Sequence, residues 1–380
     1  MDASDRRSVL LTLGYACVIV VLAQIMSNTV IGGRDASSPP FFLHGFLSHY
    51  EVIPPLARWD SIWYYAISQY GYGLSIGTWE GKAAFFPLLP IVVGTVSGLL
   101  NLNVFWTGII VSISCAAAAL VFMLRYLRIR FGVTESEADY IQFIYLCSPA
   151  AFILVSFYSE SMFIMLVVIG LWARASDRTW LCFIVFFLAG LTRIHALAFA
   201  AAILVDAARC SWRAGKIDLK RFLGGIGAFL GVGSYFGYLW WTFGDPFHYM
   251  VIQKKYWDVK PFDIVSDWSA VVMNFGQDAS FSGLANLVDN LFPAFYLVAL
   301  VWLIRRKYVL EAGIVFFVLL MSVVGGNFWG IARYTLFIFP AFVLLKFLSR
   351  HRYGYSLSIP LIAIQFCFLF QFVFTVPPAP

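Results

Sequence analysis

Four charged residues in an otherwise weakly charged sequence have side chains suited to one chemistry: Asp60, Glu160, Arg193 and Arg333. A carboxylate within hydrogen-bonding reach of a hydroxyl group can accept its proton and make the oxygen a nucleophile. Guanidinium groups bind a departing phosphate bidentately and keep their charge. A phosphate leaving group requires no proton, so one carboxylate suffices, unlike glycoside hydrolysis, where a second carboxyl group protonates the leaving oxygen. The pattern predicts transfer onto a hydroxyl group with Asp60 as the base and the two arginines as the phosphate clamp.

The neighbours of Asp60 add aromatic candidates. Asp60 lies in the segment ARWDSIWYYAISQYGY, residues 57–72. We expect Arg58 and Trp59 to position this segment and Tyr64 to contact a substrate. The aromatic side chains are equally typical of the belt at a membrane interface, and the alternatives for Asp60 are a helix N-cap or a salt bridge with Arg58.

The other charged candidates also have structural alternatives. Glu160, in FYSES, is typical of a carboxylate at the positive end of a helix. Arg193, in LTRIHAL, has the alternative of extending to the membrane surface, and Arg333, in NFWGIARY, that of anchoring a helix at the interface. Charged side chains at membrane depth usually face a protein interior or an aqueous cavity, because their insertion costs a few kcal/mol. We therefore predict that these residues share one site.

Four further residues are candidate substrate-binding residues on weaker grounds: His195, Gln253, Trp257 and Tyr334. A histidine in an apolar segment is more commonly a core residue whose hydrogen bonds are satisfied. Gln253 and Trp257 fall in a predicted external loop, for which a solvated face is the commoner role.

No cofactor and no compact metal motif follows from these residues. Asp60, Glu80 and Glu160 offer hard oxygen ligands, so a divalent ion is an alternative, but their spacing defines no site. The six cysteines are scattered singly, without the spacing of a zinc or redox site. We predict no metal ligand and no required cofactor.

Composition determines which kind of fold must position these residues. Of the 380 residues, 61% are hydrophobic, 38 are Phe and only 12% are charged, a balance that water-soluble domains of this length do not need. In hydrocarbon a chain must satisfy its own backbone, which requires spanning helices of about 20 residues. We predict an all-α polytopic membrane protein that forms a single domain, residues 1–380.

The apolar runs predict a bundle of about eleven helices with two long outer loops. The first outer loop, residues 31–102, is rich in Gly, Pro, Trp and Tyr and is expected to carry interfacial helices, and the second covers residues 244–290. The runs are residues 9–30, 84–100, 103–124, 139–157, 160–174, 179–208, 222–243, 291–304, 308–324, 333–348 and 355–375.

Two runs leave the topology open. Either 84–100 lies along the outer surface and 179–208 doubles back near Arg193, or 84–100 spans and 179–208 crosses once. The first arrangement brings more of the 26 Lys and Arg to the cytoplasm, so the positive-inside rule favours it. It requires two helices of about 14 residues, which need shielding by protein or a thinner membrane. It also places the N-terminus in the cytoplasm and the charged candidates at the outer side. The net charge of +6 then comes mostly from Lys and Arg in cytoplasmic loops, so it does not indicate a nucleic-acid partner.

Six segments in order along the chain resemble the PIG-V mannosyltransferases, the glycosylphosphatidylinositol mannosyltransferase 2 family within the GT-C membrane glycosyltransferases. The resemblance covers nearly the whole chain and implies a GT-C-like helical bundle. The segments are RWDSIWYYAISQYGY, AAFFPLLP, CSPAAFILVSFYSESMF, AGLTRIHALAF, FGDPFHYMVIQKKYW and ARYTLFIFPAF.

The resemblance implies transfer of mannose or a related sugar from a polyprenyl-phosphate donor, with inversion, to a lipid-linked or surface glycan on the outer or lumenal side. It also implies that Asp60 is the catalytic base, Glu160 the second outer-loop acid and Arg193 the basic residue between paired short helices. The chain is short for a eukaryotic member of the family. This indicates a bacterial homologue in the plasma membrane, whereas a eukaryotic member would lie in the endoplasmic reticulum.

A secondary transporter of an anionic substrate is the alternative from another class, because it would also bury arginines and carboxylates. Transporters commonly show an internal repeat with broken helices and a site near the bilayer midplane. The sequence shows no such repeat, and its acids concentrate in predicted outer loops. Glycosyl transfer is therefore the favoured prediction.

Overall fold

A computed structural model of the chain describes residues 2–29, 53–73, 79–257, 294–324, 331–351 and 353–374. These described residues form helices, turns and connecting segments without a strand, which confirms the all-α prediction. Much of the first predicted outer loop and most of the second lie outside the described residues. Four described helices are long and apolar enough to cross a membrane: Ala3–Asn28, Val104–Phe131, Ala332–Arg350 and Gly354–Phe374.

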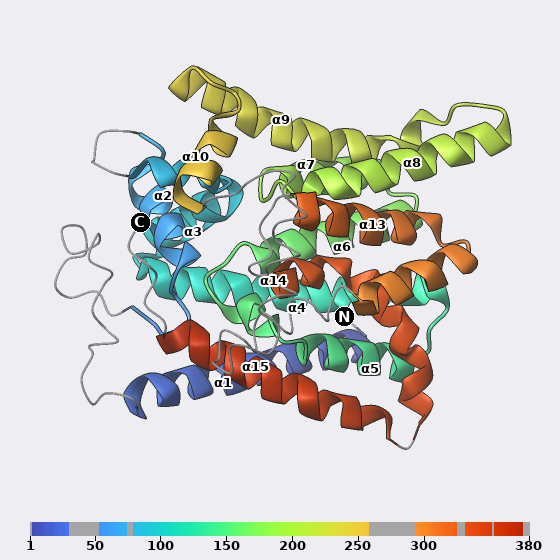
Figure 1. Cartoon of the computed structure of the whole chain (residues 1–380), viewed down its shortest axis with the longest axis horizontal. Coiled ribbons are helices and arrows are strands. Elements are labelled where there is room, and N and C mark those ends of the chain that lie inside the picture. Colours follow the sequence, from blue (N-terminus) through green and yellow to red (C-terminus); the bar gives the residue numbers. More distant parts are fainter. Residues whose placement is uncertain are drawn as a thin grey trace, which may run out of the picture.

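The chain contains both long and short helices (Figure 1). The α-helices are α1 Ala3–Thr29, α2 Asp60–Tyr70, α3 Leu88–Leu100, α4 Val104–Phe131, α5 Glu135–Leu146, α6 Glu160–Ala175, α7 Thr179–Gly190, α8 Ala196–Ala214, α9 Leu223–Phe243, α10 His248–Trp257, α13 Val309–Val324, α14 Ile331–Thr335 and α15 Ser358–Phe374. A further helix covers Ala294–Arg305. The 3-10 segments are η2 Trp79–Ala84, η3 Ala151–Val155, η4 Leu219–Arg221, η5 Leu336–Arg350 and η6 Gly354–Leu357.

Both ends of the central helix α4 are encoded in the sequence. The Asn103 side chain accepts hydrogen bonds from two backbone N–H groups of the first turn. Gly132 follows the last turn with φ +61°, a conformation that glycine adopts without strain. Thr134 and Glu137 then form a capping box that starts α5.

The structure corrects the predicted run 139–157. These residues do not form one helix, because α5 ends at Leu146 and η3 begins only at Ala151. Pro149 lies in the turn between them. Proline has no N–H to continue a helix and disfavours helical backbone in the residue before it. The chain turns here and delivers Glu160 to the first position of α6.

The break predicted within the run 179–208 is confirmed. α7 ends at Gly190 and α8 begins at Ala196, so Arg193 lies in the turn between them. The short α7 packs closely against α9, and a Cβ atom added at Gly231 would lie 2.1 Å from the carbonyl oxygen of Phe187. α7 also contacts α6 and α8, so protein shields this helix of 12 residues on several sides.

The run 84–100 contains the short helix α3. Its 13 residues extend for about 20 Å, which is less than the bilayer core of about 30 Å. α3 packs against α2 and α4. Together with α10, α2 and α3 gather at one end of the bundle (Figure 1).

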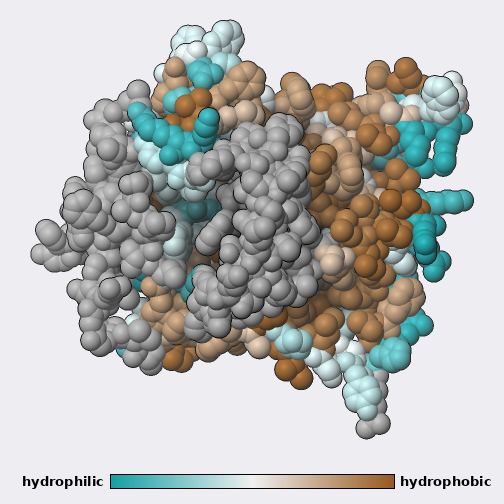
Figure 2. Space-filling model, in the orientation of Figure 1, coloured by the Kyte–Doolittle hydropathy of each residue, from teal (hydrophilic) through white to brown (hydrophobic). Residues whose placement is uncertain are grey.

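The opposite end of the bundle is rich in arginine and lysine, and we call it the basic end. It contains Arg130, Arg174 and Arg213, in the last turns of α4, α6 and α8. Hydrophilic side chains gather there beyond a wide hydrophobic zone, on the right of Figure 2. The ion pair between Arg125 and Asp5, at 2.5 Å, brings the first turn of α1 close to the C-terminal part of α4.

Candidate active site

The structure brings Asp60, Glu160, Arg193 and Arg333 into one cluster, which we call the acid–arginine cluster. Arg333 Nη1 donates a hydrogen bond of 2.7 Å to Asp60 Oδ2, and Arg333 Nε lies 3.0 Å from Glu160 Oε1. Arg193 Nη1 lies 3.0 Å from the same Glu160 oxygen. Arg333 therefore links the two carboxylates, and Glu160 links the two arginines. The residues come from the starts of α2, α6 and α14 and from the turn between α7 and α8.

A turn at Trp59 sets the position of Asp60. Trp59 has φ +56°, which is strained for a residue other than glycine, and the helix α2 starts at the next residue. The indole Nε1 of Trp59 donates to the carbonyl of Phe372 in α15, at 3.3 Å. The Asp60 N–H donates to the hydroxyl oxygen of Tyr158. Asp60 Oδ1 accepts no hydrogen bond from the described residues, so one carboxylate oxygen is anchored and the other is available.

Glu160 is fully buried between the two arginines. Neither of its carboxylate oxygens accepts a well-directed hydrogen bond from the described residues, although Arg193 and Arg333 both lie at ion-pair distance. A buried carboxylate is costly unless opposite charges compensate it. Glu160 also occupies the first position of α6, where the helix dipole favours negative charge. It therefore combines both predicted roles, as a helix-start residue and as a member of the site.

Ser159 connects the cluster to α2. Its Oγ accepts hydrogen bonds from Arg193 Nη1 and from the hydroxyl group of Tyr64, each at 2.7 Å. Ser159 and Glu160 together hold Arg193 inside the protein, and only 12% of its side chain is exposed. This geometry does not fit the alternative in which Arg193 extends to the membrane surface. The sequence analysis missed Ser159 and Tyr158, although both adjoin Glu160 in FYSES.

His195 lies beside the two arginines, and one of its ring nitrogens lacks a hydrogen-bond partner among the described residues. Its ring packs against the Tyr334 ring at 4.6 Å, and its Nδ1 is buried without a hydrogen-bond partner among the described residues. The described residues thus do not supply the hydrogen-bond partner that is expected for the Nδ1 of a core histidine. Burial, with the positive charges of Arg193 and Arg333, lowers the pKa of His195 well below its ordinary value. The imidazole is neutral at pH 7 and can still donate or accept one hydrogen bond.

A cavity of about 100 Å³ opens onto the acid–arginine cluster. Its lining includes most of the candidate substrate-binding residues, among them Gln253 and Trp257 from α10. The side chains of Phe85 and Trp257 meet at a ring distance of 5.6 Å and form an aromatic wall of the kind on which a sugar ring packs. The lining residues are Asp60, Tyr64, Ala84, Phe85, Phe86, Thr192, Arg193, Ile194, His195, Tyr249, Gln253, Trp257, Arg333 and Tyr334.

Besides the buried Glu160, three residues named in the sequence analysis do not line this cavity: Arg58, Trp59 and Glu80. The Trp59 ring is instead directed to α15. Asp60 forms its described ion pair with Arg333, in place of the alternative pair with Arg58. Glu80 pairs with Lys255 at 2.5 Å on the exposed surface, and this ammonium group lowers the pKa of Glu80. Within the described part of the chain, no three His, Cys, Asp or Glu side chains are arranged to hold a metal ion.

The fold and the site define a polytopic helical membrane protein whose carboxylates and arginines meet at one end of the bundle. The family model Mannosyltransferase (PIG-V) matches residues 7–221, more than half of the chain. The chain therefore belongs to the PIG-V mannosyltransferase family and is a glycosyltransferase. No curated protein and no solved structure matches it.

The matched region includes Asp60, Glu160 and Arg193 but ends before Arg333. Arg333 is 273 residues away from Asp60 in the sequence, and only the fold brings their side chains together. The cluster is thus completed by a part of the chain that the family model does not cover.

Proposed function

We propose that this chain transfers mannose, or a closely related sugar, from a polyprenyl-phosphate donor to a hydroxyl group of a lipid-linked or surface glycan, with inversion at the anomeric carbon. The observation that carries the proposal is the link that Arg333 makes between Asp60 and the buried pair of Glu160 and Arg193. It puts an available carboxylate oxygen and two guanidinium groups on one cavity. Family membership favours this reaction over the transport alternative.

Asp60 serves as the base in the proposed reaction. Its Oδ1 takes the proton of the acceptor hydroxyl group as the acceptor oxygen forms a bond with the anomeric carbon. The bond between that carbon and the phosphate oxygen breaks, and its electron pair remains on the phosphate. Attack from the face opposite to the phosphate inverts the anomeric carbon, and no second acid is required.

The charges of the cluster suit this step. The two carboxylates and two guanidinium groups balance one another before the reaction. Protonation of Asp60 leaves one positive charge in excess at the moment when the leaving phosphate gains a negative charge. Arg193 and Arg333, which both line the cavity, are placed to stabilise that phosphate, and His195 offers it a neutral hydrogen-bonding group. Glu160 does not line the cavity and acts as a positioning residue for the arginines.

The positive-inside rule gives the proposed orientation. The basic end faces the cytoplasm, so the acid–arginine cluster faces the outer or lumenal side, where a polyprenyl-phosphate sugar and a surface glycan meet. No cofactor takes part in the steps assigned to these residues.

The experiment that tests the proposal measures sugar transfer in membranes supplied with radiolabelled polyprenyl-phosphate mannose. Asp60→Asn keeps the shape of the side chain but removes the base, and transfer is expected to fall by about 10²- to 10⁴-fold. Glu80→Gln, at equal expression, is the matched control because it removes a carboxylate near the cavity that does not line it. Equal transfer by the Asp60→Asn variant and the wild type would remove Asp60 from the chemistry.

A further inference from the structure

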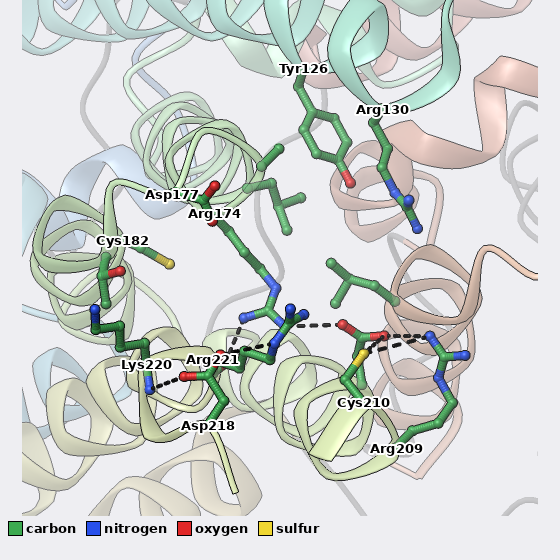
Figure 3. A pocket seen from close by; sticks show the side chains of 15 residues that line it. Tyr126, Arg130, Arg174, Asp177, Cys182, Arg209, Cys210, Asp218, Lys220 and Arg221 are labelled. Atoms are coloured by element: carbon green, nitrogen blue, oxygen red, sulfur yellow. Dashed lines mark hydrogen bonds and ion pairs between the residues drawn. The ribbon is translucent and has the colours of Figure 1, made fainter. Parts of the chain in front are cut away.

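A second and larger cavity, of about 470 Å³, lies at the basic end (Figure 3). It is formed where α4, α6 and α8 end and α7 and α13 begin, and η4 closes one side. The basic side chains in its lining are Arg130, Arg174, Arg209, Lys220 and Arg221, and the acidic ones are Asp177, Asp206 and Asp218. The helix α6 separates it from the acid–arginine cluster, because Glu160 starts this helix and Arg174 lies in its last turn.

The carboxylates of this cavity do not neutralise its cations. Arg174 and Arg209 each donate a hydrogen bond of 3.0 Å to the same buried carboxylate, that of Asp206. The ammonium group of Lys220 forms no ion pair with any described residue, and the dashed line at Lys220 in Figure 3 is the hydrogen bond that its backbone N–H donates to Asp218. The lining therefore has two more positive than negative charges. When Glu311, the ion-pair partner of Arg130, is also counted, one positive charge remains in excess.

Exposed tryptophans place this cavity at the level of lipid headgroups. Trp180 in the first turn of α7 and Trp212 in the last turn of α8 are 71% and 88% exposed. They neighbour Thr179 and Arg209, which line the cavity. Tryptophans are enriched where the hydrocarbon core meets the headgroups, and arginines and lysines on the cytoplasmic side. Basic pockets between helices at this depth suit anionic headgroups.

We propose that the cavity binds the phosphate of an anionic phospholipid from the cytoplasmic leaflet. Lys220 and Arg209 offer the phosphate N–H donors that are not bonded to Asp206. Arg174 holds the Asp206 carboxylate in place. A phosphodiester has one negative charge, which matches the excess of positive charge around the cavity. The site would fix the far ends of α6 and α8, whose opposite ends present Glu160 and Arg193. The proposal does not depend on the sugar donor.

The test uses the full chain in nanodiscs of phosphatidylcholine, with increasing amounts of phosphatidylglycerol. Binding is followed as the rise in the thermal midpoint and as lipid retained in native mass spectrometry. The variant Arg209→Gln/Lys220→Gln is expected to weaken the apparent affinity for phosphatidylglycerol by about tenfold or more. The control Arg213→Gln/Lys216→Gln removes the same charge from the same end without altering the lining, and it should bind as the wild type does. Lys220→Gln alone, which breaks no ion pair among the described residues, should show an intermediate loss.

Each other outcome overturns the proposal. If both double variants lose the response equally, the lipid acts through general electrostatic attraction and not through this cavity. If inorganic phosphate added to pure phosphatidylcholine nanodiscs raises the midpoint as much, and the Lys220→Gln variant loses that rise, the ligand is a free phosphate and not a lipid. If no variant changes retention of phosphatidylglycerol, the arginines of the cavity serve only to join the helix ends.

Discussion

The two ends of the bundle both bury carboxylates among arginines, yet they differ in how far these carboxylates are hydrogen-bonded. At the basic end, Glu311 accepts hydrogen bonds from Tyr126 and Arg130, and Asp206 accepts them from two arginines. In the acid–arginine cluster, both oxygens of Glu160 lack a well-directed donor among the described residues, and His195 Nδ1 lacks a partner.

At the basic end the carboxylates are satisfied within the protein, whereas in the acid–arginine cluster the buried Glu160 carboxylate is not. Buried polar atoms are nearly always hydrogen-bonded, so unsatisfied atoms beside a cavity indicate a ligand. The carboxylates at the basic end accept their hydrogen bonds from groups of the protein. The positive charges there outnumber the negative ones. In the proposed reaction, the acid–arginine cluster gains hydrogen-bond partners when donor and acceptor enter. The two ends should therefore respond differently to equivalent substitutions.

The largest contrast is expected from replacing one arginine at each end by lysine. Arg333→Lys should lower transfer by about 10²-fold, because a single ammonium group cannot contact both Asp60 and Glu160 as the planar guanidinium does. Arg130→Lys should lower the thermal midpoint but leave the rate of transfer near that of the wild type. Initial rates measured below both midpoints check this, and equal losses of rate would contradict a functional difference between the ends.

The next contrast compares Glu160 with Glu311, both of which are fully buried. Glu160→Gln leaves two arginines without their shared counter-ion, and breaking a buried ion cluster costs about 3–5 kcal/mol of stability. We expect a lower midpoint together with a fall in kcat of about tenfold, while KM for the donor changes less, since Glu160 positions the arginines and does not line the cavity. Glu311→Gln should lower the midpoint alone.

A conservative variant separates positioning from folding in this comparison. Glu160→Asp keeps the charge and should recover part of the lost rate. If Glu160→Gln and Glu311→Gln reduce kcat to the same extent, the effect of Glu160 is one of general stability.

The charged members of the candidate site could be predicted from the sequence because burying a charge in an apolar chain costs free energy. Such residues are therefore rare and easy to recognise. Asp60, Glu160, Arg193 and Arg333 all meet in the structure. The helical class and the break near Arg193 followed from hydropathy and the positive-inside rule. These features depend on composition and local order, which a sequence displays directly.

The remaining features depend on geometry that a sequence does not display. Ser159 and Tyr158 are ordinary polar neighbours until the fold aims them at Arg193 and Asp60. The side chain of Trp59 leaves the cavity because its backbone turns through positive φ. The pairing of Arg333 with Asp60 joins segments far apart in the chain. The cavity at the basic end likewise arises where several helix ends meet, none of which indicates a cavity by itself.

The smallest expected effect concerns the unsatisfied His195. Its folded pKa is depressed, so below the ordinary value of 6.5 the unfolded chain binds a proton that the folded ring does not. Stability is therefore unaffected by this group above that pH and falls as the pH decreases below it, by at most about 1.4 kcal/mol per pH unit. His195→Phe should flatten the decline of the thermal midpoint with acidification, whereas His248→Phe, in α10, serves as a control for the number of histidines. An unchanged slope in the His195 variant would mean that a protonatable partner or water satisfies its Nδ1 already, and the contrast between the two ends would then rest on Glu160 alone.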